Sequence, residues 1–327
     1  MTDLIIKPVV GIGDVQPGDD LAALITTAAP WIVDGDVLVV TSKIVSKSEG
    51  NLAEVPREGP ERAVRKTEIL AAETARVVAT RPGIRIVQTH HGFIMNAAGI
   101  DASNVDASHL VLLPKDPDAS ARALRADLRE RFGLDVVVIV SDTMGRPWRT
   151  GLTDVALGVA GMDAIRDYRG EFDPYGNELH VTQMSPADEL AGAAELVKGK
   201  YDQVPVAVIR GLDITGQADG AGAAVLIRTT DTDMFSMGTD EGIAEGLRRA
   251  AALNADDTAV SWVETSDGAI AYVPADASAD QLVRAGAAIA AKRCELAADA
   301  VDTVWEATAE LPERSGYQAL GRIRRQV

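Results

Sequence analysis

The sequence has a single cysteine, Cys294, among its 327 residues. One cysteine cannot form a disulfide within the chain or build a cysteine-rich metal site, and this scarcity is typical of proteins of the reducing cytoplasm. The sequence also lacks an apolar run of about 18 residues, the length needed to cross a bilayer, and a secretory signal at its start. We therefore expect a cytoplasmic protein with no membrane contact.

Several catalytic signatures are missing as well. The four histidines, His90, His91, His109 and His180, do not fall at H-x-x-x-H or H-E-x-x-H spacing, which disfavours zinc hydrolase chemistry. No G-x-S-x-G or G-x-G-x-x-G segment follows an apolar run, which disfavours esterases and Rossmann dehydrogenases. The G-x-x-x-x-G-K-[ST] spacing of a P-loop is absent too.

Positive charge is scarce relative to negative charge. The chain carries 32 Lys and Arg against 49 Asp and Glu, a formal net charge of −17. Long-range repulsion of phosphates argues against nonspecific binding to DNA or RNA. An anionic substrate must then be met by local cations or by a bound metal. Apolar residues make up 46% and charged residues 25%, the profile of a globular protein with an ample core.

The most informative stretch that is present is Ser141–Gly151, which directly follows the apolar run Val136–Val140. Such a run predicts a buried strand, and open sheets place ligand chemistry beyond the carboxyl ends of their strands. Asp142 and Thr143 offer hard oxygen ligands for Mg²⁺ or Mn²⁺. The stretch therefore predicts a cation site at a strand end.

Two arginines, Arg146 and Arg149, lie in the same stretch and suit bidentate contacts to carboxylate or phosphate. Asp142 comes directly after buried residues, where a charge is costly unless a cation pairs with it. That cation is a metal ion or one of the two arginines, and the sequence leaves both open. Asp154 is a candidate structural partner for the same arginines.

Three further loops begin at predicted strand ends: Gly11–Asp14, Thr41–Lys47 and Gly99–Asn104. The first is either an ordinary turn or a nucleotide contact. The lysines of the second form either a phosphate cradle or a solvated face. Asp101 in the third either caps a local turn or ligates a metal. Four such loops in one chain predict a shared site at the ends of a sheet.

The order and spacing of these motifs resemble the GTP-dependent gamma-glutamyl ligase family of deazaflavin coenzyme F-420 biosynthesis. The combination of GIDxSN with SDTxGRPWR is specific, and the resemblance continues as far as Gly246. The segments that carry it are Gly11–Asp14, Thr41–Gly50, Asn96–Asn104, Ser141–Arg149, Asp173–Leu179 and Val204–Gly211.

The resemblance implies an enzyme that uses GTP to activate the terminal carboxylate of the coenzyme precursor as an acyl phosphate. The amine of L-glutamate then displaces phosphate to form an amide. Metal ligands fall on Asp101, Asp142 and Thr143, and we add Arg146 and Arg149 to the catalytic set because the substrates are anions that repel one another. GTP contacts fall on Gly11, Ile12, Gly13, Asp14, Ser42, Lys43, Lys47 and Asn104.

One position departs from the family pattern. Archaeal members carry a metal-ligating glutamine at the position of Lys200. Actinobacterial relatives resemble this sequence in having a lysine there. An ammonium group cannot ligate a cation, so we expect Lys200 to contact the nucleotide and offset phosphate charge. The expected cofactors are Mg²⁺ or Mn²⁺ with GTP as substrate, and the resemblance leaves room for a monovalent cation such as K⁺. The glycine-rich Gly216–Gly222 is the candidate loop that closes over the site.

The resemblance also implies an α+β fold of mixed sheets with flanking helices, in an intertwined homodimer. We expect a ligase domain over residues 1–246 and a C-terminal extension over 247–327. In the extension, Val260–Val273 predicts a hairpin and Ala279–Leu311 a long helix. The extension is too short for the nitroreductase-like domain of actinobacterial relatives, so a stand-alone ligase is expected.

Two alternatives stay open at this point. The chain could be a catalytically silent nucleotide-binding regulatory module, or an amide ligase that acts on a different carboxylate.

Overall fold

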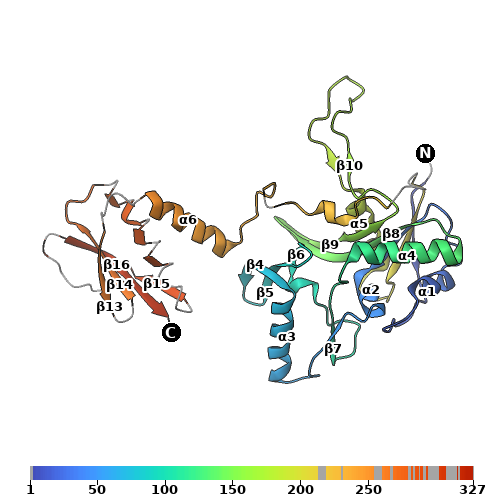
Figure 1. Ribbon diagram of the computed structural model, residues 1–327, viewed down its shortest axis with the longest axis horizontal. Helices are drawn as coiled ribbons and strands as arrows, with labels where there is room; N and C mark the ends of the chain where they lie inside the picture. Colours follow the sequence, from blue (N-terminus) through green and yellow to red (C-terminus); the bar gives the residue numbers. More distant parts are fainter. Residues whose placement is uncertain are drawn as a thin grey trace. The chain divides into compact units, whose positions relative to one another are not determined.

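The computed structural model describes residues 3–212, 219–229, 231–253, 260–265, 268–278, 281–282, 284–286, 288–289, 292–293, 302–306, 315 and 317–326. The chain divides into two compact units, Met1–Ser236 and Met237–Val327. The division falls just before helix α6 (Thr239–Leu253), whereas the predicted domain boundary lies inside that helix. Helices and strands are mixed in the larger unit, which confirms the predicted α+β class (Figure 1).

A five-stranded mixed sheet forms the centre of the larger unit. Its middle strands are continuous apolar runs, and β2 lies parallel to β8 while the other neighbours are antiparallel. Continuous apolar strands are expected where both faces of a sheet are covered. In spatial order the strands are β1 (Ile5–Val9), β12 (Val206–Arg210), β2 (Val37–Thr41), β8 (Val137–Arg146) and β9 (Arg149–Ala160).

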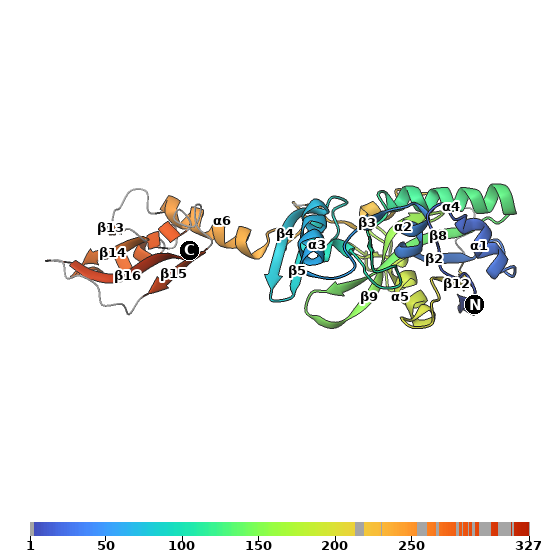
Figure 2. The ribbon, with the colours of Figure 1, turned by 90° about the horizontal axis from the view of Figure 1, so that it is seen from below.

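Helices cover both faces of this sheet, as Figure 2 shows. One face packs against α1 (Leu21–Ala28), α2 (Ser42–Ser48) and α4 (Pro117–Phe132). The other packs against α5 (Pro186–Lys198) and the short 3₁₀ helix η2 (Ala223–Leu226). Alternate residues of each central strand point to opposite faces, so every strand contributes to both cores.

Smaller sheets and one helix position the loops beside the central sheet. The pair β3–β7 continues the chain after α2, and the three-stranded β4–β5–β6 sheet leads into the Asp101 loop. A thin arm based on β10 and β11 projects from the larger unit (Figure 1). The bounds are β3 (Leu52–Glu54), α3 (Pro60–Ala72), β4 (Thr74–Arg81), β5 (Ile84–Thr89), β6 (Ile94–Asn96), β7 (His109–Val111), β10 (Arg166–Asp167) and β11 (Gln183–Met184).

The smaller unit contains a four-stranded antiparallel sheet in the order β13–β14–β16–β15. The predicted hairpin is confirmed as β13 (Ser261–Thr265) and β14 (Gly268–Pro274). The predicted helix is wrong at its end, because β15 (Asp302–Glu306) is a strand paired with β16 (Tyr317–Gln326). The described residues between 281 and 293 are helical, and Cys294 lies outside the described residues.

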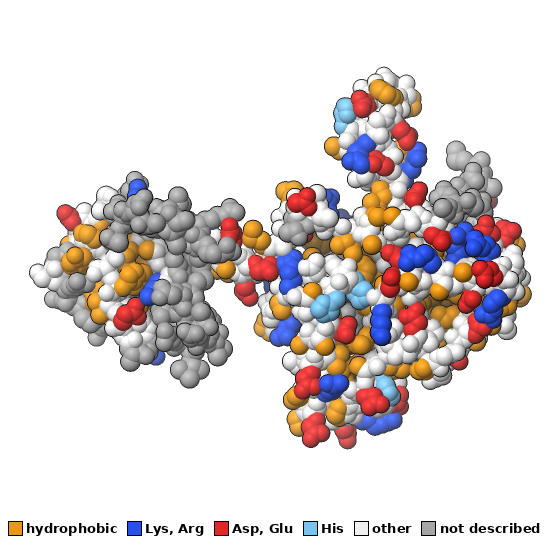
Figure 3. Space-filling model, in the orientation of Figure 1, with side chains coloured by type: hydrophobic (Ala, Val, Ile, Leu, Met, Phe, Trp, Pro, Cys, Tyr) orange, Lys and Arg blue, Asp and Glu red, His pale blue; other side chains and the backbone are white. Residues whose placement is uncertain are grey.

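The surface of the larger unit mixes both signs of charge. Figure 3 shows acidic side chains interspersed with Lys and Arg on the visible face. Among the described residues, no helix combines the length and the apolar character that crossing a bilayer requires.

Candidate active site

The segment that follows β2 starts beside the polar second half of β8. Thr41, the last residue of β2, is the register partner of Ser141 in β8. Helix α2 therefore starts at Ser42 next to Asp142, and the Ser42 hydroxyl hydrogen-bonds the Asp142 carboxyl. Parallel pairing of β2 and β8 thus brings two of the four predicted loops together.

The third loop joins through an ion pair between Lys43 and Asp101. The Lys43 Nζ lies 2.5 Å from a carboxylate oxygen of Asp101 and donates to Ser103 Oγ at 2.7 Å. The Ser103 N–H donates to the other Asp101 oxygen at 2.7 Å. Burial alone would raise the pKa of Asp101, but Lys43 and the Ser103 hydrogen bonds hold it below its usual value. Asp101 is therefore an ionised carboxylate that is held in an Asx turn and forms an ion pair with Lys43.

The fourth loop joins through Lys47 of α2. The buried Lys47 ammonium forms an ion pair with Asp14 and donates to the backbone carbonyl of Asn104 at 3.0 Å. Gly11 and Gly13 adopt φ angles of +88° and +78°, which L side chains rarely take, and the intervening Ile12 side chain is buried in the core. Ile12 can therefore reach a ligand only through its backbone, a limit on its predicted nucleotide contact.

Asp142 is a half-buried carboxylate among other carboxylates. Burial, helped by the negative charges of Asp154 and Asp101, raises the pKa of its carboxyl to about 6 against the lowering effect of hydrogen bonds from Thr143 and Ser42. No lysine or arginine within the described ranges forms an ion pair with it, so the arginine pairing considered from the sequence does not occur. A carboxylate in this setting attracts a cation.

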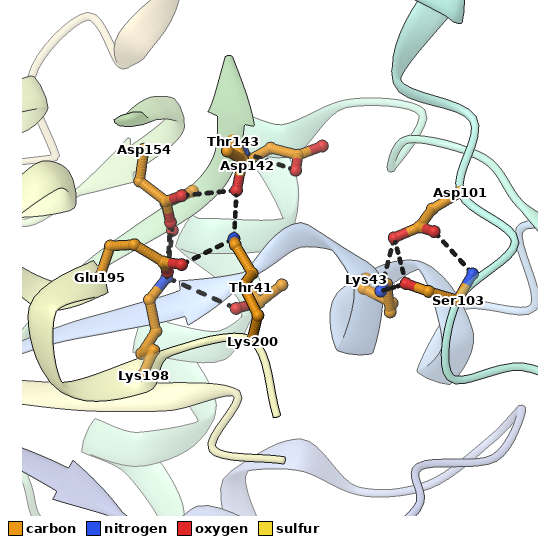
Figure 4. Close-up of polar contacts among 11 residues, drawn as sticks. Thr41, Lys43, Asp101, Ser103, Asp142, Thr143, Asp154, Glu195, Lys198 and Lys200 are labelled. Atoms are coloured by element: carbon orange, nitrogen blue, oxygen red, sulfur yellow. Dashed lines mark hydrogen bonds and ion pairs between the residues drawn. The ribbon is translucent and has the colours of Figure 1, made fainter. Parts of the chain in front are cut away.

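Beneath Asp142 lies a buried ion pair that the sequence analysis missed. The Lys198 Nζ donates to Asp154 at 2.7 Å and to Ser141 Oγ at 2.9 Å, and both charged side chains are almost fully buried. Asp154 also accepts hydrogen bonds from the hydroxyls of Ser141 and Thr143 at 2.9 and 2.8 Å. The proposed pairing of Asp154 with the arginines is therefore wrong, because Lys198 is its cation (Figure 4).

Lys200 extends this network of hydrogen bonds around Thr143 and Asp154. Its ammonium group donates to Thr143 Oγ1 at 2.7 Å and pairs with Glu195 at 2.6 Å (Figure 4). Lys200 therefore lies beside Thr143, a predicted metal ligand, and donates to its hydroxyl; its contact with the nucleotide stays a prediction. The Thr143 hydroxyl accepts from Lys200 and donates to Asp154.

The two predicted catalytic arginines lie elsewhere. The sequence predicts a loop over Ser141–Gly151, but β8 continues through Arg146 and the chain turns back at Arg149 into β9. Arg146 lies four positions beyond Asp142 along the strand, roughly 13 Å at about 3.3 Å per residue. Both arginines are exposed at the end of the hairpin, near Trp148 in the sequence. The Trp148 ring contacts the Phe235 ring edge to face, with 4.7 Å between the ring centroids. Within this chain they do not join the Asp142 cluster.

The structure thus brings together the predicted residues of four segments and leaves out the arginines. In the described part of the chain, no three His, Cys, Asp or Glu side chains lie close enough to hold a metal ion by themselves. Of the candidate closing loop, Gly216–Gly222, the first three residues lie outside the described residues. Paired lysines and carboxylates, delivered to one edge of a sheet by separate segments, define an enzyme site for charged substrates.

Comparison with known proteins identifies the enzyme family. The F420-0:gamma-glutamyl ligase family matches residues 10–211. The chain belongs to this family and is a ligase.

Three curated relatives carry the name coenzyme F420:L-glutamate ligase. The protein of Methanothermobacter thermautotrophicus is 39% identical over 69% of this chain and 96% of its own length. That of Methanopyrus kandleri is 38% identical over 70% and 96%, and that of Haloarcula marismortui is 41% identical over 68% and 92%.

Proposed function

We propose that this chain ligates L-glutamate to the terminal carboxylate of the deazaflavin coenzyme F-420 precursor, with GTP as the energy source. The names of the relatives support L-glutamate and the F-420 coenzyme as the substrates. The observation that carries the rest is the gathering of Lys43, Lys47 and three carboxylates at one sheet edge, since a triphosphate needs cations and a metal needs carboxylates.

The chemistry starts from the low reactivity of a carboxylate. An oxygen of the precursor carboxylate attacks the γ-phosphorus of GTP, GDP leaves, and an acyl phosphate forms. The glutamate nitrogen then attacks the carbonyl carbon, phosphate leaves, and the nitrogen gives up a proton. Lys43 and Lys47 exchange their present partners, Asp101 and Asp14, for phosphate oxygens, and Lys200 offsets further negative charge.

The residues present fit a divalent cation. Asp142 lies near two like charges, and the pKa of its carboxyl is raised to about 6. Mg²⁺ is usually held by one or two carboxylates, with substrate phosphates completing its shell, so a third protein carboxylate is not required. Asp101 and Asp142 would hold the ion. Thr143 could join them only through its backbone, because its hydroxyl lies on the other side of β8 and is engaged by Lys200 and Asp154. When bound, the ion would neutralise charge on the nucleotide phosphates. Ligation by Asp101 would require Lys43 to release this carboxylate.

We also propose that the chain works as a homodimer. The support is the projecting arm, where Phe172, Tyr175 and Val181 are 66, 93 and 88% exposed. Apolar side chains gathered on a protruding segment are typical of a surface that a second protein covers. Sedimentation equilibrium of the wild type and of a Tyr175→Ser, Val181→Ser double variant tests this, and a monomeric wild type contradicts it.

Mass spectrometry of the deazaflavin product tests the proposed reaction. The full chain is incubated with precursor, L-glutamate, GTP and Mg²⁺ or Mn²⁺, and GDP is measured in parallel. We expect one GDP for each glutamyl group added, and Asp142→Asn should lower the rate at least about 100-fold. Lys66→Gln, a change on the surface of α3, is the control. Product formed without GTP, or at full rate in Asp142→Asn, would contradict the mechanism.

A further inference from the structure

A cavity of about 270 Å³ lies beside the β8–β9 ribbon, in the larger unit. Side chains alternate along a strand, so Met144, in its lining, points to the same side of β8 as Asp142. Thr143 points to the opposite side, where it meets Asp154. Met144 and Val155, the register partner of Asp142, place part of the cavity on the Asp142 side of the ribbon, about 7 Å farther along the strand. Ala156 and Asp188 of α5 extend the lining round the free edge of β9.

The floor of the cavity is apolar and tightly built. Phe93 packs in one cluster with Met144, Val155 and Ile227. Gly92, at the turn before Phe93, has a φ of +99°, and a Cβ built there would lie 3.3 Å from the Ile227 side chain. The positive φ favours glycine at this turn, and a side chain there would also press against Ile227 in the segment after η2. This close approach fixes the wall of the cavity.

Four charged side chains line the same cavity: two arginines, Arg76 and Arg228, and two aspartates, Asp188 and Asp233. Each is anchored. Arg76 Nε donates to Gln88 Oε1 at 2.7 Å, and Arg228 donates to a backbone carbonyl at 3.4 Å.

The two aspartates are anchored by backbone. One oxygen of Asp188 accepts the Ala156 N–H, and one oxygen of Asp233 accepts the Phe235 N–H, both at 2.9 Å. A carboxylate has two oxygens and about four acceptor sites, so each aspartate keeps acceptor capacity for a ligand. The cavity therefore presents two cations and two anions at fixed positions.

This pattern is the complement of an α-amino dicarboxylic acid. Two guanidinium groups match two carboxylates, an aspartate matches the ammonium, and the apolar floor matches the methylene groups between them. Drug-sized ligands occupy cavities of about 300–1,000 Å³, so 270 Å³ suits an amino acid. It is too small for a whole tricyclic deazaflavin with its side chain.

We propose that this cavity binds the amino-acid substrate, L-glutamate, with its amine toward Asp142. This proposal rests on the proposed function, and it says where the amine substrate of that reaction binds. The activated carboxylate would form at the metal ligands, and the amine would reach it along the same face of β8.

Steady-state kinetics of arginine variants test the position. We expect Arg228→Gln and Arg76→Gln each to raise the KM for L-glutamate by about tenfold or more, because each loses a charge-assisted hydrogen bond. The KM for GTP and the KM for the precursor should stay within about twofold. Arg85→Gln, in β5 of the same small sheet as Arg76 but outside the cavity lining, is the matched control and should change none of the three.

Two results would overturn the proposal: a KM for L-glutamate that stays at the wild-type value in both variants, or a rise confined to the KM for the precursor. Failure of the proposed function looks different, since the wild type would then form no glutamylated product. In that case, calorimetric titration of L-glutamate into the full-length wild type and Arg228→Gln tests the cavity alone. Binding to the wild type that is lost in the variant supports it, and no binding to the wild type refutes it.

Discussion

At the scale of single residues, the most consequential contact is the ion pair between Lys198 and Asp154, because both side chains are almost fully buried. Removing one partner of such a pair leaves an uncompensated charge, at a cost of about 3–5 kcal/mol. We expect Lys198→Met to lower the free energy of unfolding by that amount, measured by urea denaturation of the full chain.

Lys200→Met is the matched control for this prediction. Lys200 is 58% exposed and its pair with Glu195 is a surface contact, so its loss should change stability by less than about 1 kcal/mol. Equal unfolding midpoints for the two variants would show that the buried pair contributes little.

Asp142 leads to a pH prediction for cation binding. Because burial raises its pKa to about 6, the carboxyl of the metal-free protein keeps its proton up to that pH. A divalent cation binds the ionised form, so apparent Mn²⁺ affinity should fall by up to about tenfold for each pH unit below 6 and level off above it. Calorimetric titrations at about pH 5 and about pH 7.5 measure this.

The sign for stability follows from the same shift. The folded state holds a proton that the unfolded chain releases near pH 3.8, so this group stabilises the metal-free fold most at low pH. That stabilisation is lost as pH rises through about 6. Asp142→Asn removes the titration, and a variant with the wild-type pH dependence of Mn²⁺ affinity would contradict the assignment.

The sequence predicted many of the site residues because each follows a buried strand. Lys43 and Lys47 follow β2, Asp14 follows β1, and Asp142 lies where the apolar run of β8 ends, so topology brings them together. Lys198 was missed because a lysine in the last turn of a helix is usually a solvated charge. Only the packing of α5 against the sheet shows that it is buried.

At the scale of elements, the contact between α4 and β9 leaves no room for a side chain at Gly158. A Cβ built there would lie 2.0 Å from the Pro117 carbonyl oxygen and 2.8 Å from the Asp118 N. The start of α4 cannot move away easily, because Asp118 accepts hydrogen bonds from Val159 N and Ala223 N at 2.8 and 2.7 Å. We expect Gly158→Ala to cost about 3 kcal/mol or more.

Gly145→Ala in the same ribbon is the control for that prediction. The nearest atom to its Cβ is 4.0 Å away, on Leu152, so the change should cost less than about 1 kcal/mol. The two variants are compared by denaturant unfolding, and similar midpoints would mean that α4 shifts to accommodate the methyl group.

The elements that the sequence predicted well are those with a strong local signal. Helix α4 ends at Gly133, a residue type that commonly follows the last turn of a helix, and the φ of Gly133 is +70°. The polar half of β8 and the start of β9 have no apolar run, and they form a ribbon because they pair with each other. Likewise β15 forms because β16, distant in the sequence, supplies its hydrogen bonds. Pairing between distant segments is what local patterns do not contain.

At the scale of the whole molecule, the match to the family lies inside the larger unit. It spans residues 10–211, and that unit ends at Ser236. Within the part of the chain that the structure describes, the residues of the candidate site and the lining of the proposed glutamate cavity also belong to that unit. The smaller unit has its own four-stranded sheet and its own apolar cluster around Ala269, Ala271 and Ile323.

This division predicts that the two units can be separated. The relatives named above match about 70% of this chain over nearly all of their own length, so they have no counterpart to most of the rest. We expect a chain ending at Ser236 to unfold cooperatively and to keep its kcat and its KM for GTP within about twofold of the full-length values. Circular dichroism with denaturant and the product assay measure both properties. A truncated chain that folds but has lost activity would instead assign the smaller unit a part in catalysis, since no residue of the larger unit is changed.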